Sequence, residues 1–268
     1  MDITVNGQQT FCYTGGKAFD PARPSVVFLH GVLNDHSVWI LQTRYLAHHG
    51  WNVIAPDLPG HGRSAGDPPA TVQEAAGFAL ALLDALALPR AALVGHSFGS
   101  LIALEAAAQA PDRVAQLVMV GTAFPMRVSP ALLENSLKHP QKAIDMVNQY
   151  SHASIAPPPS VLGPGTWVPG GSRALMRRVL ASNRQVNVFH RGFVACDSYR
   201  EGEASMARVQ APVLFILGRR DQMTPPRAAQ GLVKAARDGR VVEVDAGHQM
   251  MAEAPDAVLD ALRGFLKP

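Results

Sequence analysis

Residues 94–100, Val-Gly-His-Ser-Phe-Gly-Ser, constrain the fold of this chain more than any other stretch. An apolar run leads into them, and residues 101–108, which are rich in alanine and leucine, follow, so the pattern predicts a strand, a sharp turn and a helix. Gly95 and Gly99 have no side chains and would let the strand and the helix pass close to Ser97. The Ser97 hydroxyl would then stand above the N-terminus of the helix, where the dipole and unpaired N–H groups favour a developing oxyanion. The stretch therefore predicts a serine nucleophile.

A serine nucleophile needs a base that removes its proton and an acid that holds the base. Two later stretches supply these groups. Residues 211–218 form a predicted buried strand that leads to Asp221, and residues 240–244 form a predicted strand that leads to His248. Ligands bind at the edge of a parallel sheet where the carboxyl ends of the strands meet, so both side chains are expected beside Ser97. We therefore predict Ser97, Asp221 and His248 as the catalytic residues.

The elbow and the chain order of serine, acid and histidine resemble the α/β-hydrolase family. Two more motifs are similar to that family. His-Gly-Val-Leu-Asn at residues 30–34 follows an apolar strand, and Asp-Leu-Pro-Gly-His-Gly-Arg-Ser occupies residues 57–64. The resemblance implies an oxyanion hole formed by the backbone N–H groups of Val32 and Phe98. It also implies that the polar side chains of residues 57–64 are scaffold rather than catalytic groups.

The resemblance implies a fold of the α/β class, the α/β-hydrolase fold, with a mostly parallel eight-stranded sheet flanked by helices and a helical cap inserted after the sixth strand. Residues 3–5 and 11–13 predict a hairpin at the antiparallel edge of that sheet. The alternation of strands and helices fails between residues 124 and 206. We therefore expect an α/β-hydrolase core domain of residues 1–123 and 207–268 and a helical cap, or lid, of residues 124–206. Within the cap, helices are expected at residues 130–138, 141–150, 171–181 and 185–196, with breakers at 157–159, 163–165 and 169–171.

A cap of this kind excludes water and shapes the substrate pocket. The candidate pocket residues are His30, Leu33, Met126, Trp167, Phe193 and Met250. His30 is expected to be mainly structural, because that is its usual role in this loop of the family.

Charge and hydropathy exclude several classes of protein. The formal net charge is +3, without a basic block, so a nucleic-acid partner is not expected. The most apolar stretch, residues 75–88, contains Asp84 and is too short to span a bilayer, so no membrane association is expected. The N-terminus lacks the basic and apolar layout of a signal peptide, and we expect a cytoplasmic location.

The sequence predicts no metal and no other cofactor. Cys12 and Cys196 lie far apart without metal-ligand spacing and are expected to be buried free thiols. Neither a G-x-G-x-x-G nor a Walker-type phosphate loop occurs. The expected partner is a small-molecule ester or lactone, and assembly into a homo-oligomer is left open.

The resemblance and the serine at position 97 imply a hydrolase that cleaves a small carboxylic ester or lactone through an acyl-enzyme. Dehalogenases and epoxide hydrolases of this fold have aspartate at the elbow instead. The main alternative is a carbon–carbon bond hydrolase of diketone acids, of the kind that acts on meta-cleavage products. An arginine facing Ser97 from the cap would favour it, the candidates being Arg173, Arg177, Arg178, Arg184 and Arg191. A haloperoxidase-like perhydrolase and a ligand receptor without enzymatic activity are further alternatives.

Overall fold

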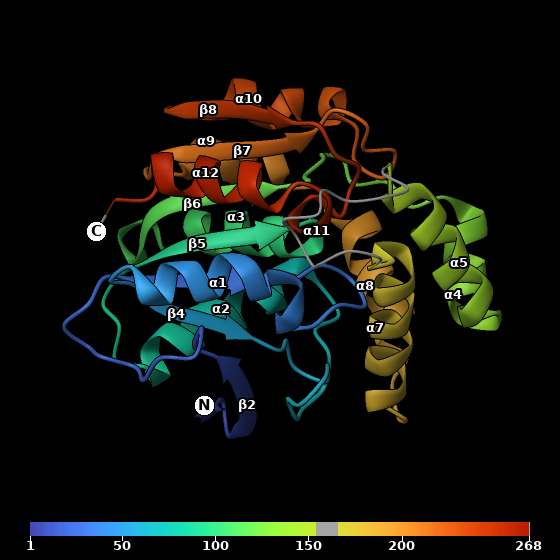
Figure 1. The fold of residues 1–268 in the computed structure, drawn as a ribbon, viewed down its shortest axis with the longest axis horizontal. Helices are drawn as coiled ribbons and strands as arrows, with labels where there is room; N and C mark the ends of the chain where they lie inside the picture. The colour runs from blue at the N-terminus through green and yellow to red at the C-terminus, as the bar shows by residue number, and fades with distance from the viewer. Residues whose placement is uncertain (154–165, 268) are drawn as a thin grey trace.

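The computed structural model describes residues 1–153 and 166–267, and its centre is one eight-stranded sheet (Figure 1). The strand order is β1-β2-β4-β3-β5-β6-β7-β8. β1 and β2 form an antiparallel hairpin, β2 pairs antiparallel with β4, and the other neighbours are parallel. The predicted mostly parallel sheet with an antiparallel edge is thus confirmed. The strands are β1 (Asp2–Val5), β2 (Gln8–Tyr13), β3 (Ser25–Leu29), β4 (Asn52–Pro56), β5 (Ala91–His96), β6 (Val114–Val120), β7 (Val213–Gly218) and β8 (Gly239–Val244).

The central strands β3 and β5 are buried along their whole length and mostly apolar because both faces of the sheet are covered. Side chains alternate between the faces, so Val26 and Phe28 of β3 enter one hydrophobic cluster, while Val27 and Leu29 enter the other. Helices cover both faces, as Figure 1 shows. One face carries η1 (His36–Trp39), α1 (Ile40–His48), α11 (Met250–Glu253) and α12 (Pro255–Phe265); the other carries α2 (Val72–Ala85), α3 (Phe98–Gln109), α9 (Gly202–Arg208) and α10 (Gln230–Ala235). Short 3₁₀ turns, η2 (Pro111–Arg113) and η3 (Pro226–Ala229), complete these connections.

A helical insertion follows β6, as predicted, and stands beyond one end of the sheet (Figure 1). Its described helices are α4 (Pro130–Lys138), α5 (Pro140–Ser151), α7 (Val168–Ser182) and α8 (Val188–Ser198). They share a hydrophobic cluster that includes Ile144, Met176 and Phe189. The division into a core of residues 1–123 and 207–268 and a cap of residues 124–206 stays a prediction. The predicted breakers at 157–159 and 163–165 lie outside the described residues.

The prediction of a breaker at residues 169–171 is wrong, because these residues form the first turn of α7. Proline is tolerated at the start of a helix, where its missing N–H has no intrahelical partner to lose. Gly170 has a packing role, since a Cβ on it would lie 2.2 Å from Cε3 of Trp167. The helix therefore begins before the expected residue 171.

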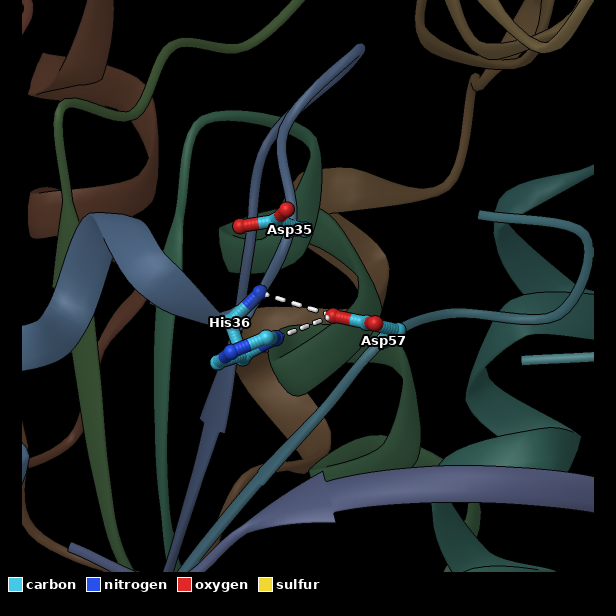
Figure 2. Close-up of side chains that lie close together, drawn as sticks. All are labelled: Asp35, His36 and Asp57. Carbon is cyan, nitrogen blue, oxygen red and sulfur yellow. Dashed lines mark hydrogen bonds and ion pairs between the residues drawn. The ribbon is translucent and has the colours of Figure 1, made fainter. Parts of the chain in front are cut away.

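The residue 57–64 motif builds a fixed turn beside the insertion. Asp57 is buried, and its Oδ1 accepts hydrogen bonds from the backbone N–H of His36 at 2.9 Å and from Nδ1 of His36 at 2.7 Å (Figure 2). Its Oδ2 accepts from the backbone N–H of Arg63 at 2.9 Å. Burial opposes ionisation of Asp57, but the hydrogen bonds and charge of His36 outweigh it and lower the pKa of the carboxyl below its usual value. These contacts agree with the predicted scaffold role of the motif.

Asp35 lies beside this pair and ties the core to the insertion. Polar atoms of Asp35, His36 and Asp57 lie within 4.8 Å of one another (Figure 2). Asp35 Oδ1 accepts from Ser37, and Asp35 Oδ2 accepts from Nη2 of Arg178 on α7 at 2.8 Å. The carboxylate oxygens of Asp35 and Asp57 and Nδ1 of His36 thus have protein partners, and the Asp35–Arg178 pair links the core to the insertion.

The two cysteines and the hydropathy of the helices are also part of the sequence prediction. Cys12 and Cys196 are buried free thiols, as predicted. Within residues 1–153 and 166–267, none of the helices has the length and apolar character needed to cross a bilayer.

Candidate active site

Ser97 occupies a strained turn between β5 and α3. Its backbone has φ +53° and ψ −118°, a combination that costs an L-residue about 1–3 kcal/mol. Two close approaches hold the turn in this conformation. A Cβ on Gly95 would lie 2.0 Å from the carbonyl oxygen of Gly99, and a Cβ on Gly99 would lie 2.2 Å from the carbonyl oxygen of Leu29. Both positions therefore require glycine, which is the physical basis of the G-x-S-x-G pattern at this turn.

Asp221 holds the imidazole of His248. Oδ2 of Asp221 lies 2.8 Å from Nδ1 of His248, and both side chains are buried. Because the carboxylate accepts from Nδ1, Nε2 is the ring nitrogen left to exchange a proton with a neighbouring group. Each residue follows the end of its strand, Asp221 after β7 and His248 after β8, as the pattern predicts.

The Asp221 carboxylate is fully supplied with donors. Oδ1 accepts from the backbone N–H groups of Met223 and Thr224, each at 2.8 Å. Oδ2 accepts from the Thr224 hydroxyl at 2.8 Å as well as from His248. Burial opposes ionisation, but the charge and hydrogen bond of His248 and the hydrogen bonds of Thr224 outweigh it and hold the pKa of Asp221 below its ordinary value. The group is therefore a carboxylate at neutral pH.

One cavity brings Ser97 and His248 together. Its volume is about 440 Å³, within the range of small-molecule sites. The loops that follow strands of the sheet contribute Val32, Ser97, Gln222, Met223, Thr224 and His248 to its lining. The insertion contributes Met126, Arg127, Val128, Ser129, Ala131, Leu132, Met146, Tyr150, Phe193 and Cys196. The larger part of the described wall is apolar and belongs to the insertion.

The two predicted oxyanion donors lie on the two loops that flank Ser97. Phe98 is the first residue of α3, so its N–H has no acceptor within the helix. Val32 lines the cavity and follows Gly31, where a Cβ would lie 3.2 Å from Cβ of Ser97. The backbone of Val32 therefore runs next to the serine.

His30 is a buried structural histidine. Its Nδ1 lies 2.9 Å from the carbonyl oxygen of Gly31, and its Nε2 accepts from the backbone N–H of Leu58 at 3.0 Å. A carbonyl can only accept, so the proton is on Nδ1 and the ring is neutral. Burial lowers the pKa of His30 from its usual value, which favours the neutral ring. Both ring nitrogens therefore have protein partners. The His30 side chain is also not among the described lining of the Ser97 cavity.

The other predicted pocket residues divide into two groups. Met126 and Phe193 line the Ser97 cavity. Leu33 and Met250 are fully buried in hydrophobic clusters and are not among its lining. Trp167 is 61% exposed and lines a different cavity, beside Leu175 and Arg178 of α7 for example.

Sequence reasoning did not single out three residues that the structure brings to the site, namely His96, Arg127 and Thr224. Thr224 had a local signal, because an aspartate followed at the third position by threonine commonly forms a hydrogen-bonded turn. Arg127 lies in the loop between β6 and α4, where no periodic pattern fixes which residues face the sheet.

His96 is buried next to the predicted base. Its Nε2 lies 3.0 Å from the carbonyl oxygen of His248, and the two ring centroids are 4.6 Å apart. Because the carbonyl oxygen can only accept, Nε2 of His96 carries the proton and donates a hydrogen bond to the His248 carbonyl oxygen. Burial and the neighbouring His248 lower the pKa of His96 to about 3, so the ring is neutral at physiological pH.

Comparison with known proteins gives matches along the whole chain. An epoxide hydrolase of Caballeronia sordidicola is 33% identical over 136 residues, 50% of this chain and 40% of that protein. Protein ABHD8 of Bos taurus is 27% identical over 248 residues, 89% of this chain and 55% of that protein. The chain thus spans about half the length of the curated relatives it matches.

Solved structures resemble the fold over nearly its full length. The enol-lactonase from Burkholderia xenovorans LB400 superposes with a TM-score of 0.83 at 23% identity, covering 99% of both chains. A thermophilic esterase superposes with a TM-score of 0.80 at 27% identity, covering 99% of this chain and 96% of the other. A sequence model described as the alpha/beta hydrolase family matches residues 26–261, from the third strand to the last helix. The chain therefore belongs to the alpha/beta hydrolase family.

Proposed function

We propose that this chain is a serine hydrolase that cleaves a small carboxylic ester or lactone through an acyl-enzyme on Ser97. One observation carries the proposal: Ser97, on its strained turn, and His248, held at Nδ1 by Asp221, line the same cavity. Nε2 of His248 takes the proton from the Ser97 hydroxyl as the oxygen attacks the carbonyl. Asp221 keeps the ring in the required tautomer and stabilises the imidazolium that forms.

The attack places negative charge on the carbonyl oxygen. The backbone N–H groups of Val32 and Phe98 hold that charge, and each such donor typically lowers the barrier by about 3 kcal/mol. His248 then returns its proton to the leaving alcohol, and the acyl group stays on Ser97. His248 then takes a proton from water, which attacks the acyl carbonyl. As the bond to Ser97 Oγ breaks, His248 returns that proton to Oγ and the acid is released.

Serine at position 97 argues for acyl chemistry over epoxide opening, although one relative is an epoxide hydrolase. A serine that opened an epoxide would form an ether, and an ether has no carbonyl for the second attack by water. An ester or lactone gives an acyl-serine, which the same oxyanion donors help to hydrolyse. The esterase and enol-lactonase among the structural neighbours agree with this choice.

The arginines expected for a carbon–carbon bond hydrolase do not favour that alternative. None of Arg173, Arg177, Arg178, Arg184 and Arg191 is among the described lining of the Ser97 cavity. Several are engaged elsewhere: Arg173 with Asp145, Arg178 with Asp35 and Arg191 with the carbonyl oxygen of Pro68. Arg127, which also belongs to the insertion, does line the cavity, so a carbon–carbon bond hydrolase of diketone acids stays the second candidate beside the proposed ester and lactone chemistry.

The test is hydrolysis of short and medium p-nitrophenyl esters by the wild type and by Ser97→Ala, with labelling by a fluorophosphonate probe. We expect the wild type to turn over and to label, and Ser97→Ala to do neither. Ser37→Ala is a matched control, because Ser37 is a partly buried serine that bonds Asp35 outside this cavity. Labelling without ester turnover would redirect the search to diketone acids and peracid formation. Wild-type protein that neither labels nor hydrolyses would overturn the proposal and favour a ligand receptor.

A further inference from the structure

The wall of the Ser97 cavity carries an uncompensated positive charge. Among the described residues that line it, Arg127 is the only lysine, arginine, aspartate or glutamate. Other arginines of the insertion have acidic partners; Arg173 pairs with Asp145 at 2.9 Å and Arg178 with Asp35 at 2.8 Å. Arg127, in the described part of the chain, makes no ion pair with an acid.

The backbone on both sides of Arg127 is anchored, so the position of this residue at the cavity is defined. Met126 is buried in the main hydrophobic cluster, and the N–H of Phe124 donates to the carbonyl oxygen of Ala228 at 2.9 Å. On the other side, the N–H of Val128 donates to Oδ1 of Asp197 at 2.9 Å. Asp197 thus serves the backbone of this loop, while the Arg127 side chain stays exposed.

The start of α4 adds positive potential at the same wall. Ser129 is the N-cap residue of this helix, and Ser129, Ala131 and Leu132 all line the cavity. The N-terminus of a helix carries a partial positive charge. An arginine and a helix N-terminus therefore act on the cavity in the same direction, without an acidic residue among the described lining to offset them.

We propose that the substrate of this site is an ester or lactone that bears a second, free carboxylate, and that Arg127 binds that carboxylate. The inference rests on the proposed serine-hydrolase function and names its substrate class. The apolar wall formed by residues such as Met126, Met146 and Phe193 accepts the hydrocarbon part, while the guanidinium pairs with the carboxylate. The same residue disfavours positively charged esters by like-charge repulsion.

The test uses two matched pairs of substrates. In the first pair, p-nitrophenyl hexanoate is compared with the mono-p-nitrophenyl ester of adipic acid, which places the carboxylate on the acyl side. In the second, phenyl acetate is compared with 4-acetoxybenzoate, which places it on the leaving group. The measured quantity is the ratio of kcat/KM for the anionic ester to kcat/KM for the neutral ester.

We expect Arg127→Gln to lower this ratio about two- to fivefold for at least one pair, because an exposed charge pair contributes up to about 1 kcal/mol. The neutral ester has no carboxylate for the guanidinium to bind, so its kcat/KM should fall less than that of the anionic ester. In the described part of the chain the Arg127 side chain makes no hydrogen bond or ion pair whose loss would disturb the fold. Arg127→Lys retains the positive charge, so its ratio of kcat/KM for the anionic ester to that for the neutral ester should stay close to the wild-type ratio. Arg44→Gln is the matched control, because Arg44 is an exposed arginine of α1 that does not line the cavity.

A second measurement needs only the wild type. Raising the ionic strength from about 0.05 M to about 0.5 M should lower kcat/KM for the anionic ester and leave the neutral ester nearly unchanged. The proposal falls if Arg127→Gln leaves the ratio of both pairs unchanged while hydrolysis still requires Ser97. If the wild type and Ser97→Ala give the same background rate on every ester, the serine-hydrolase function itself fails, and this proposal fails with it.

Discussion

At Asp221, four donors converge on one buried carboxylate, and this makes the residue a pH-dependent element of stability. Its pKa in the folded chain is below the value of about 3.9 expected for an unfolded aspartate. The unfolded chain therefore binds more protons around that pH. The stabilisation is fully present above the unfolded pKa and is lost as the pH falls through the folded pKa.

We accordingly predict that the stability difference between the wild type and Asp221→Asn depends on pH. The free energy of unfolding of the wild type should exceed that of the variant most near pH 7, and this difference should shrink below about pH 4. Urea unfolding followed by circular dichroism between pH 7 and pH 3 measures the two free energies. Asp260→Asn, which removes a carboxylate 72% exposed on α12, should follow the wild type closely throughout. A gap that stays constant down to pH 3 would contradict the prediction.

We predict that His96 positions His248, because its Nε2 donates a hydrogen bond to the backbone carbonyl oxygen of His248 at 3.0 Å. Replacing it with phenylalanine removes the donor to the His248 carbonyl oxygen and lets the base shift. Misplacement of a catalytic group by a fraction of an ångström to one ångström costs about 10- to 100-fold in rate, so kcat should fall by that amount. KM should change little, because His96 is not among the described lining of the cavity.

Steady-state kinetics on one p-nitrophenyl ester separate these effects. His96→Gln should recover much of kcat, because its amide N–H can donate to the same carbonyl oxygen. The pH profile of kcat should keep its shape, because the pKa of His96 is about 3 and the ring is therefore neutral at every pH of the assay. A change confined to KM, or a glutamine variant no better than phenylalanine, would show that His96 has only a packing role.

At the scale of elements, the turn between β5 and α3 is the most constrained connection. α3 is buried on all sides from Phe98 to Ala108, so it cannot move away from the sheet to admit a larger residue. The carbonyl oxygen of Leu29, on β3, stands where a Cβ of residue 99 would lie. Strand, turn and helix therefore form one rigid unit that fixes the position of Ser97.

Gly99→Ala should consequently destabilise the fold by at least about 3 kcal/mol, because the clash is with backbone atoms that cannot rotate away. Gly77 on α2 offers the opposite case, since it is an exposed helical glycine with open space around it. Gly77→Ala should stabilise by about 0.5–1 kcal/mol and raise Tm by about 1–4 °C. Thermal unfolding of both variants tests this. Gly99→Ala with near wild-type Tm would show that the turn can relax.

Across the whole molecule, the sequence predicted what local patterns determine. Continuous apolar runs, such as residues 25–29 and 213–218, became central strands because both faces of the sheet are covered. The order of the polar residues that follow the strands placed Asp221 against His248 before any geometry was known. The roles of these residues in catalysis stay a prediction until they are tested.

Local patterns could not predict which side chains line the cavity. Leu33 has a positive φ and turns into a hydrophobic cluster, while its neighbour Val32 lines the cavity. Trp167 is the N-cap residue just before α7 and packs against Gly170, and it lines a different cavity. These outcomes depend on how the inserted helices dock on the core, and docking is set by tertiary contacts rather than by periodicity.

The arrangement of the cavity wall has a consequence for how this enzyme family changes its specificity. The described lining between Met126 and Cys196 comes from one uninterrupted stretch of chain, whereas Ser97, Asp221 and His248 all lie outside that stretch. Two genetic crossovers, one after β6 and one before β7, would therefore replace most of the wall and keep Ser97, Asp221 and His248. The residues that select the substrate can then change by exchange of the insertion alone, while Ser97, Asp221 and His248 are retained.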